Sequence, residues 1–198
     1  VKYLVLDEAD EMLKMGFMDD LEQIFQSLPA ERQTVLFSAT LPHSIRAIAE
    51  QHLREPQHVR IASKTQTVSR IEQAHIMVHA DQKINAVLRL LEVEDFDAVI
   101  AFVRTKQATL DLASALEAKG HKVAALNGDI AQNQRERVID SLKDGRLNIV
   151  VATDVAARGL DVSGVTHVFN FDIPQDPESY VHRIGRTGRA GEAGEAIT

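Results

Sequence analysis

Short apolar runs that stop abruptly at polar residues are the feature that most restricts the fold of this chain. The run Leu4–Leu6 ends at Asp7 and Glu8, and Thr34–Phe37 is followed by Ser38–Thr40. Continuous apolar runs of this length are typical of strands buried on both faces of a parallel sheet. Ligands bind at the carboxyl edge of such sheets, so the polar residues after each run are candidate site residues.

Amphipathic segments alternate with these runs. Apolar residues recur at helical spacing from about Asp19 to Leu28, where Pro29 ends the pattern, and Pro42 opens a second helical segment. Alternating strands and helices predict an α/β fold with a parallel sheet. The rhythm stops over 62–69, which is small and polar and which we interpret as a linker.

Beyond the linker the rhythm restarts and continues to the end of the chain. The predicted strands are Ile71–His79, Ala98–Val103, Val123–Leu126, Asn148–Ala152 and Thr166–Phe171, and the predicted helices are Lys83–Leu91, Lys106–Lys119, Ala131–Lys143 and Pro177–Ile184. These suffice for a complete doubly wound domain, whereas the first part supplies only a fragment of a sheet. We therefore expect a partial domain over 1–62, a linker over 63–70 and a complete domain over 71–198.

Composition narrows the class of protein. The 198 residues are 44% hydrophobic and 26% charged, as in ordinary globular domains. The sequence has no cysteine, which excludes disulfides and fits a reducing cytoplasm. No apolar run approaches the roughly 20 residues of a membrane helix. Val1 opens directly into a strand without an initiator methionine, so we expect both ends to be cuts within a longer protein.

Charge limits how nucleic acid could bind. A net charge of −7 disfavours a domain that is basic overall, and two Tyr with no Trp disfavour stacking of bases. A local cluster remains in the segment 182–189, where Arg183, Arg186 and Arg189 are separated by Gly185 and Gly188. The planar guanidinium suits phosphate oxygens, and arginines presented from one domain to a nucleotide on another can act as fingers.

Two of the polar strand ends allow alternative interpretations. Asp7 and Glu8 could cap the helix that follows, or could serve a Mg²⁺ ion and the attacking water of a nucleotide hydrolase. Thr153 and Asp154 follow the strand Asn148–Ala152. Thr153 could cap a short helix, or could present its hydroxyl to a phosphate.

Six segments, in order, resemble the motifs of the DEAD-box RNA helicases. They are Asp7–Asp10 (Asp-Glu-Ala-Asp), Ser38–Thr40, Ile100–Thr105, Gln132–Arg135, Thr153–Asp161 and His182–Arg189. The resemblance covers the whole chain and implies a partial RecA-like parallel sheet followed by a complete RecA-like helicase C-terminal domain. The segments Phe102–Lys106 and Ala125–Asp129 look most like the bacterial cold-shock subgroup. Asp10, where DEAH-type relatives have His, favours the DEAD-box family.

The resemblance implies roles at the nucleotide. Asp7 would reach Mg²⁺ through water, and Glu8 would position or activate the attacking water. Asp10 would couple to Ser38, Thr40 and His182. Asp161 would contact the ribose of ATP. Arg186 and Arg189 would face the γ-phosphate when two domains close.

The resemblance also implies a partner. RNA would be held by its backbone, without strong sequence preference, near Phe102, Val103, Gln132, Arg135, Thr153 and Gly159. ATP-driven domain closure would then separate short duplexes. The family further implies ribosomal or RNA-decay proteins as partners, and no membrane.

One expected motif is missing from the sequence. No Gly-x-x-x-x-Gly-Lys-Ser/Thr loop occurs in the 198 residues, so the 198-residue chain alone is predicted to be inactive as an ATPase. Two alternatives stay open at this point. The chain could serve a non-enzymatic RNA- or protein-binding module, or a DNA helicase of the same superfamily.

Overall fold

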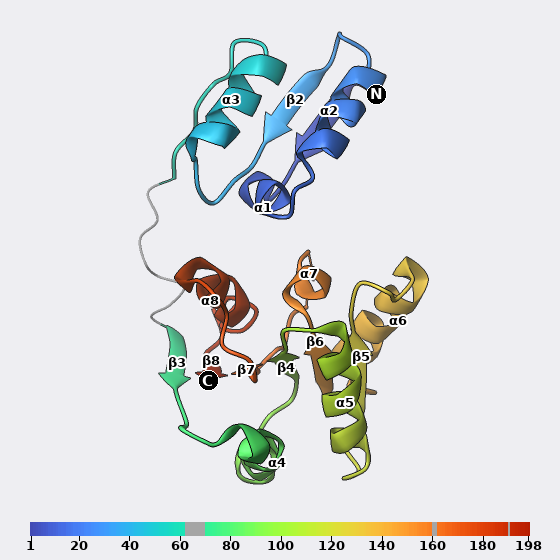
Figure 1. Cartoon of the computed structure of the whole chain (residues 1–198), viewed down its shortest axis with the longest axis vertical. Helices are drawn as coiled ribbons and strands as arrows, with labels where there is room; N and C mark the ends of the chain where they lie inside the picture. The colour runs from blue at the N-terminus through green and yellow to red at the C-terminus, as the bar shows by residue number, and fades with distance from the viewer. Residues whose placement is uncertain (62–69, 160–161, 190) are drawn as a thin grey trace. The chain divides into compact units, whose positions relative to one another are not determined.

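Two parallel sheets, one in each of two units, organise the chain. A computed structural model describes residues 1–61, 70–159, 162–189 and 191–198. Contacts within the chain divide it into one unit over Val1–Ala62 and a second over Ser63–Thr198. Figure 1 shows the elements of each unit. Residues 63–69 of the predicted linker and the predicted ribose contact Asp161 lie outside the described residues.

The first unit is a two-stranded parallel sheet with three helices. Strand β1 (Tyr3–Leu6) pairs with β2 (Gln33–Leu36) in parallel. The helices are α1 (Ala9–Lys14), α2 (Met18–Ser27) and α3 (His43–His52). Leu6 packs with Leu21 and Phe25 of α2 and Ile48 of α3 in one core.

Only one face of β1 is buried. Tyr3 and Val5 are exposed, whereas Leu6, whose side chain points to the opposite face, is buried. The prediction of a strand buried on both faces is therefore wrong for β1, because the described helices of this unit bury only the Leu6 face. Parallel pairing does place the carboxyl ends of β1 and β2 side by side, and the amide of Ala9 donates to the carbonyl of Phe37 at 3.1 Å.

The second unit is a six-stranded, all-parallel sheet of order β3-β8-β7-β4-β6-β5. The strands are β3 (Ile71–Ala74), β4 (Val99–Phe102), β5 (Val123–Leu126), β6 (Ile149–Ala152), β7 (His167–Asn170) and β8 (Gly194–Ile197). The α-helices are α4 (Lys83–Val93), α5 (Lys106–Glu117), α6 (Gln132–Lys143), α7 (Asp154–Ala157) and α8 (Pro177–Ile184), with a 3₁₀ turn, η2 (Ala80–Gln82), before α4.

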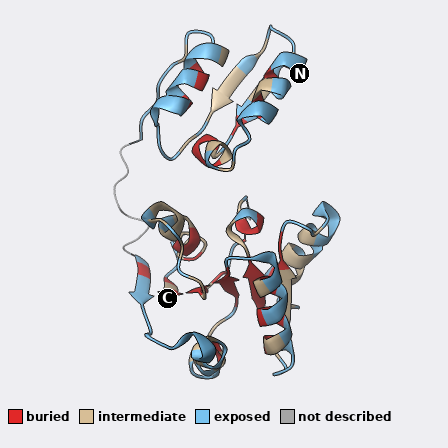
Figure 2. Cartoon of the chain, viewed as in Figure 1, coloured by how far each residue is buried: buried red, intermediate tan, exposed pale blue. Residues whose placement is uncertain are grey.

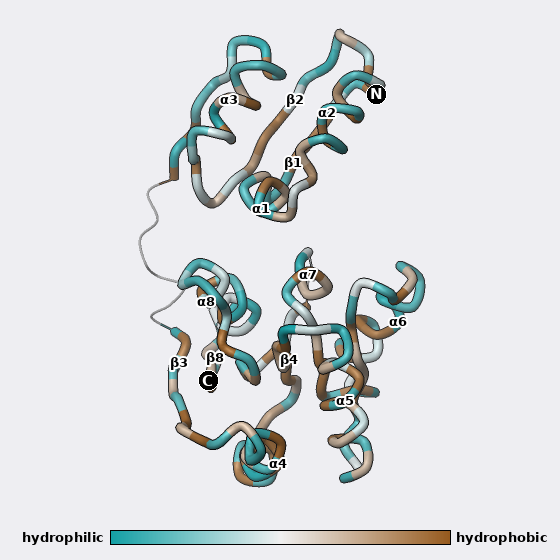
Figure 3. The backbone as a smooth tube through the Cα atoms, in the orientation of Figure 1, coloured by the Kyte–Doolittle hydropathy of each residue, from teal (hydrophilic) through white to brown (hydrophobic). Residues whose placement is uncertain are grey.

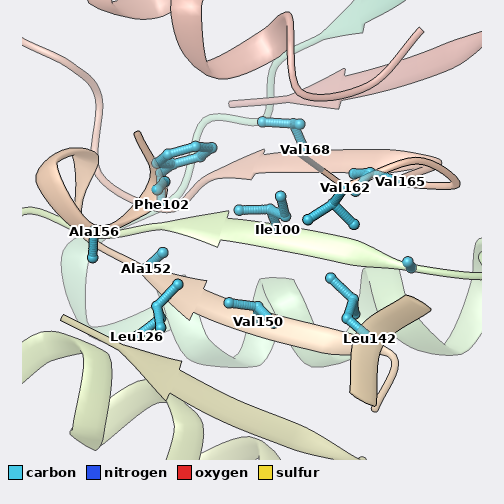
Figure 4. Packing of buried hydrophobic residues seen from close by; sticks show 12 residues of the cluster. Ile100, Phe102, Leu126, Leu142, Val150, Ala152, Ala156, Val162, Val165 and Val168 are labelled. Carbon is cyan, nitrogen blue, oxygen red and sulfur yellow. The ribbon is translucent and has the colours of Figure 1, made fainter. Parts of the chain in front are cut away.

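Helices cover both faces of this sheet. Side chains of α4 and α5 pack on one face with Val99 and Ala101, and α6 and α7 pack on the other with Ile100 and Phe102. The second cluster appears in Figure 4, where Ile100, Phe102 and Val150 gather on one face of the sheet with Leu142 of α6 and Ala156 of α7. Figure 2 shows the central strands as buried, and Figure 3 shows apolar residues concentrated there and polar residues on the outer sides of the helices.

The strand predicted over Ile71–His79 is shorter in the structure. β3 ends at Ala74, which pairs with Ile197, the last residue of β8. Ile76 still donates its amide to the carbonyl of Thr198 at 2.8 Å, but the residues after it have no neighbouring strand among the described residues. The alternation of Ala74, Ile76 and Val78 therefore indicated a longer strand than the available pairing supports. No helix among the described residues is long and apolar enough to span a membrane.

Candidate nucleotide and RNA site

Asp7 and Glu8 lie directly after β1, at the carboxyl edge of the small sheet. The carboxylate of the exposed Asp7 accepts a hydrogen bond from the amide of Glu8 at 2.9 Å. Glu8 occupies the N-cap position of α1, yet its side chain makes no capping hydrogen bond. The capping interpretation therefore has no support at Glu8, and the catalytic interpretation stays a prediction.

The backbone of Glu8 is strained. Its φ of 52° and ψ of 42° put it in the left-handed region, where Glu8 and Glu55 are the only non-glycine residues among those described. Such a conformation costs about 1–3 kcal/mol and persists where the surrounding structure enforces it, often at functional sites. Here the carbonyl of Glu8 accepts the amides of Glu11 and Met12, which start α1 and hold the strained residue in place.

Asp10 joins α1 to the segment after β2. Its Oδ2 accepts hydrogen bonds from the amide and the hydroxyl of Thr40 at 2.8 and 2.7 Å. Burial opposes ionisation, but these bonds and a further one from Ser38 outweigh it and lower the pKa of Asp10. The hydroxyl of Ser38 also donates to the carbonyl of Thr40 at 2.5 Å. The predicted coupling between Asp10 and Ser38–Thr40 is thus present as direct bonds.

The carboxyl edge of the large sheet carries the predicted RNA-contacting residues. Thr153 follows β6 and its hydroxyl accepts the amide of Ala156, so it does cap the short helix α7. An accepting hydroxyl keeps its own proton for donation, so a phosphate contact remains chemically compatible. Gln132, Arg135 and Gly159 line a common pocket of about 520 Å³. Arg135 also donates to the carbonyl of Arg158 and so ties α6 to the loop after α7.

Phe102 and Val103 lie at the end of β4 but point into the core. The two residues, main chain included, are 2% and 0% exposed. The structure therefore gives no support to the predicted RNA contact at these two positions.

The three arginines of 182–189 have different environments. Arg183 is buried and forms an ion pair with Asp154, so it cannot contribute to a basic surface as its spacing suggested. Arg186 and Arg189 are half-buried in the turn after α8, and Nε of Arg189 donates to the carbonyl of Gly185 at 2.8 Å. His182, on α8, is also half-buried.

The turn that carries Arg186 and Arg189 is anchored through Thr187. Its buried hydroxyl contacts the carbonyls of Val165 and Thr166 at 2.6 and 2.9 Å. A Cβ on Gly194 would lie 2.2 Å from that hydroxyl oxygen, so only glycine permits this approach. Gly188, in the same turn, has a φ of +63°, which side chains rarely adopt.

Asp172 was not among the predicted site residues, although it follows β7 as Asp154 follows β6. Its carboxylate accepts Nζ of Lys83 at 2.7 Å and the amide of Arg104 at 2.9 Å. Burial opposes ionisation, but these hydrogen bonds and the two positive charges outweigh it and lower the pKa of Asp172. Its position after a strand was the available signal.

The Asp172 pair gives a pH prediction. A lowered pKa means that the pair stabilises the folded unit above the unfolded-state value near ~4 and stops doing so as pH falls through the folded-state pKa. We expect the stability advantage of wild type over Asp172→Asn, measured by hydrogen exchange of β4 and β7 amides, to shrink between about pH 6 and pH 2. Asp144→Asn, which removes an exposed pair with Arg146, is the control and should show a small, constant difference. A constant difference for Asp172→Asn would contradict the prediction.

The predicted residues fall into two groups. Asp7–Asp10 and Ser38–Thr40 belong to the first unit, and the residues from Phe102 to Arg189 belong to the second. The first group follows β1 and β2, and the residues from Phe102 to Gly159 follow β4, β5 and β6, so both sets belong to the carboxyl edges of their sheets. The turn with Arg186 and Arg189 instead lies near the start of β7 and β8. Contacts from one group to the other, including that of Asp10 with His182, stay predictions.

Both groups match known families. Residues 1–48 match the DEAD/DEAH box helicases, and residues 82–191 match the helicase conserved C-terminal domain. The second match spans more than half of the chain, and the chain belongs to the DEAD-box helicase family.

Individual relatives are similar over most or all of this chain. The chain is 58% identical over 182 residues to an ATP-dependent RNA helicase DeaD of Escherichia coli, covering 92% of this chain and 29% of that protein. It is 54% identical over 198 residues to an ATP-dependent RNA helicase CshA of Listeria monocytogenes, covering 100% and 38%. Among solved structures, Dbp5 of Saccharomyces cerevisiae bound to RNA and ADP BeF3 aligns with a TM-score of 0.86 at 35% identity, covering 100% of this chain and 52% of that one. The chain thus spans about a third of the length of the curated relatives that it matches.

Proposed function

We propose that the protein containing this chain is an ATP-dependent RNA helicase that hydrolyses ATP to separate short RNA duplexes or to remodel RNA–protein complexes. The observation that carries the proposal is the strained Glu8 beside Asp7 at a strand end, in a chain of this family. A binding module has no need of a strained carboxylate at that edge, whereas a hydrolase uses one to orient the attacking water.

The residues of the first unit fit a magnesium nucleotide. Asp7 is exposed, and only its Oδ1 accepts the amide of Glu8, so Oδ2 can accept a water of a hydrated Mg²⁺. Carboxylate oxygen is the ligand that Mg²⁺ prefers, and this ion keeps several waters. When bound, the ion would neutralise charge on the phosphates. Asp10 holds Thr40 beside this edge, and Glu8 would accept a proton from, or orient, the attacking water.

The second unit supplies the remaining roles. We assign Arg186 and Arg189 to the γ-phosphate and Asp161 to the ribose. We assign Gln132, Arg135, Thr153 and Gly159 to the RNA backbone. The shared pocket of Gln132, Arg135 and Gly159 supports a backbone contact, because arginine and main-chain amides are the groups that bind phosphate. The similar structure of Dbp5 is bound to RNA, which supports RNA as the partner but does not bear on single residues. We place the activity in the cytoplasm, in cold-shock remodelling of RNA and in ribosome biogenesis.

Two rival functions can be separated by experiment. A DNA helicase of the same superfamily would be stimulated by DNA duplexes. ATP hydrolysis by the full-length protein, measured with matched RNA and DNA duplexes, should rise with RNA only. Stimulation by DNA alone would show that the protein is a DNA helicase instead. A non-enzymatic module would hydrolyse no ATP under either condition.

The 198-residue chain by itself is expected to be inactive. It holds the carboxylates and the arginines but no phosphate-binding loop with its lysine, so ATP lacks its main anchor. We expect no RNA-stimulated release of phosphate from the chain alone and clear stimulation in the full-length protein, measured side by side at equal concentration. Turnover by the chain alone would contradict this prediction.

A further inference from the structure

Arg183 is a buried cation with an unusually complete set of partners. Its residue is 3% exposed. A guanidinium that leaves water is costly unless its N–H groups are bonded and its charge is paired. Four hydrogen bonds from Arg183 meet that requirement, and they go to three different residues.

The strongest partner is Asp154. Nε and Nη2 of Arg183 donate to Oδ1 and Oδ2 of Asp154 at 2.6 and 2.8 Å, a bidentate fork. Such a pair fixes orientation as well as distance, because both planar groups must align. Asp154 is the first residue of α7, so the fork fixes this short helix relative to α8.

The other partners lie at the ends of two central strands. Nη1 donates to the carbonyl of Asp172 at 2.5 Å and to Oδ1 of Asn170 at 3.3 Å, both at the end of β7. The guanidinium carbon also lies 5.1 Å from the ring centroid of Phe102, the last residue of β4. Arg183 therefore ties α7, β7 and β4 to α8 at one point below the carboxyl edge.

The residues that we assign to RNA and those that we assign to the nucleotide are both directly linked to Arg183. Asp154 follows Thr153, which we assign to the RNA backbone and whose hydroxyl caps α7. On the other side, the amide of Arg186 donates to the carbonyl of Arg183 at 3.0 Å. Arg186 is assigned to the γ-phosphate. The residues that we assign to RNA and to the nucleotide in this unit are thus joined through one residue, Arg183, by its side chain on one side and its carbonyl on the other.

We propose that Arg183 is a positioning residue that couples RNA binding to nucleotide binding by holding α7 and the turn after α8 in one fixed arrangement. This assignment rests on the proposed function. Coupling between two ligands is reciprocal, so it can be measured from either side. A shape-filling role alone would affect folding stability and leave the coupling unchanged.

The test uses the full-length protein as wild type, Arg183→Lys and Asp154→Asn. The dissociation constant of a fluorescent oligouridine is measured without nucleotide and with ADP–beryllium fluoride, and the ratio is the coupling factor. Lysine keeps the charge but loses the fork, so we expect the coupling factor of Arg183→Lys to fall about tenfold. Asp154→Asn, which keeps the shape of its side chain, should lower it similarly. Arg89→Lys, at an exposed pair with Glu92, is the matched control and should not change it.

Folding is checked by thermal unfolding, with binding measured well below the midpoint of every variant. A lower midpoint with an unchanged coupling factor in both variants would overturn the assignment and leave the proposed function standing. A wild-type protein whose RNA affinity does not respond to nucleotide would overturn both.

Discussion

Replacing Glu8 by Gln in the full-length protein is expected to reduce RNA-stimulated ATP hydrolysis by about 10²–10⁴-fold, the usual contribution of a positioned acid–base group. The amide has nearly the shape of the carboxylate but cannot accept a proton from water. Because Glu8 acts on the attacking water in this proposal, binding of ATP should change little. Turnover is measured by phosphate release, and binding by displacement of a fluorescent nucleotide.

A matched control separates chemistry from folding. Glu50→Gln changes an exposed glutamate on α3 of the same unit and should leave turnover as in wild type. Hydrolysis that persists at the wild-type rate in Glu8→Gln would remove the catalytic assignment and favour the non-enzymatic module. The strain at Glu8 adds a second check, because Glu8→Gly relieves the left-handed backbone and removes the carboxylate. That variant should gain stability while losing turnover.

The sequence predicted the strands correctly where the pattern of apolar residues agrees with the number of neighbouring strands and helices that cover them. The runs at 99–102 and 149–152 predicted central strands because both faces of these strands are covered by helices, so every residue is apolar. The strand Gly194–Ile197 was not predicted, since a four-residue segment with one glutamate carries too little pattern. The strand predicted at β3 was too long, because alternation of apolar residues does not reveal whether a neighbouring strand is present.

The site was predictable in its residue types and less so in their environments. Asp10 and Thr40 lie 30 positions apart, and their contact was expected only from the resemblance to the DEAD-box helicases; parallel pairing of β1 and β2 brings the two segments together. The equal spacing of Arg183, Arg186 and Arg189 could not show that the first is buried. Its burial depends on Asp154 of α7 and on Asp172 after β7, which reach the same point from other parts of the chain. Long-range contacts of this kind are set by packing, and the local sequence pattern does not reveal them.

Replacing Arg186 by Lys is expected to lower the rate of ATP hydrolysis by about 10³-fold, since fingers of this kind contribute roughly 10³–10⁵. Lysine keeps the charge but cannot present two parallel N–H groups to phosphate oxygens. If Arg186 acts on charge that develops during transfer of the γ-phosphoryl group, kcat should fall while the affinity for ATP changes only a few-fold.

The local structure makes this a test of chemistry, because the turn that carries Arg186 is held by the hydroxyl of Thr187 and by main-chain bonds that a lysine retains. Arg146→Lys, in an exposed pair with Asp144, serves as the control and should keep the wild-type rate. A fall in ATP affinity with unchanged kcat would show that Arg186 binds the ground state, and the finger role would then pass to Arg189. That outcome has a structural basis, because the bond from Arg189 to the carbonyl of Gly185 uses Nε and so does not use the donors on the two terminal nitrogens.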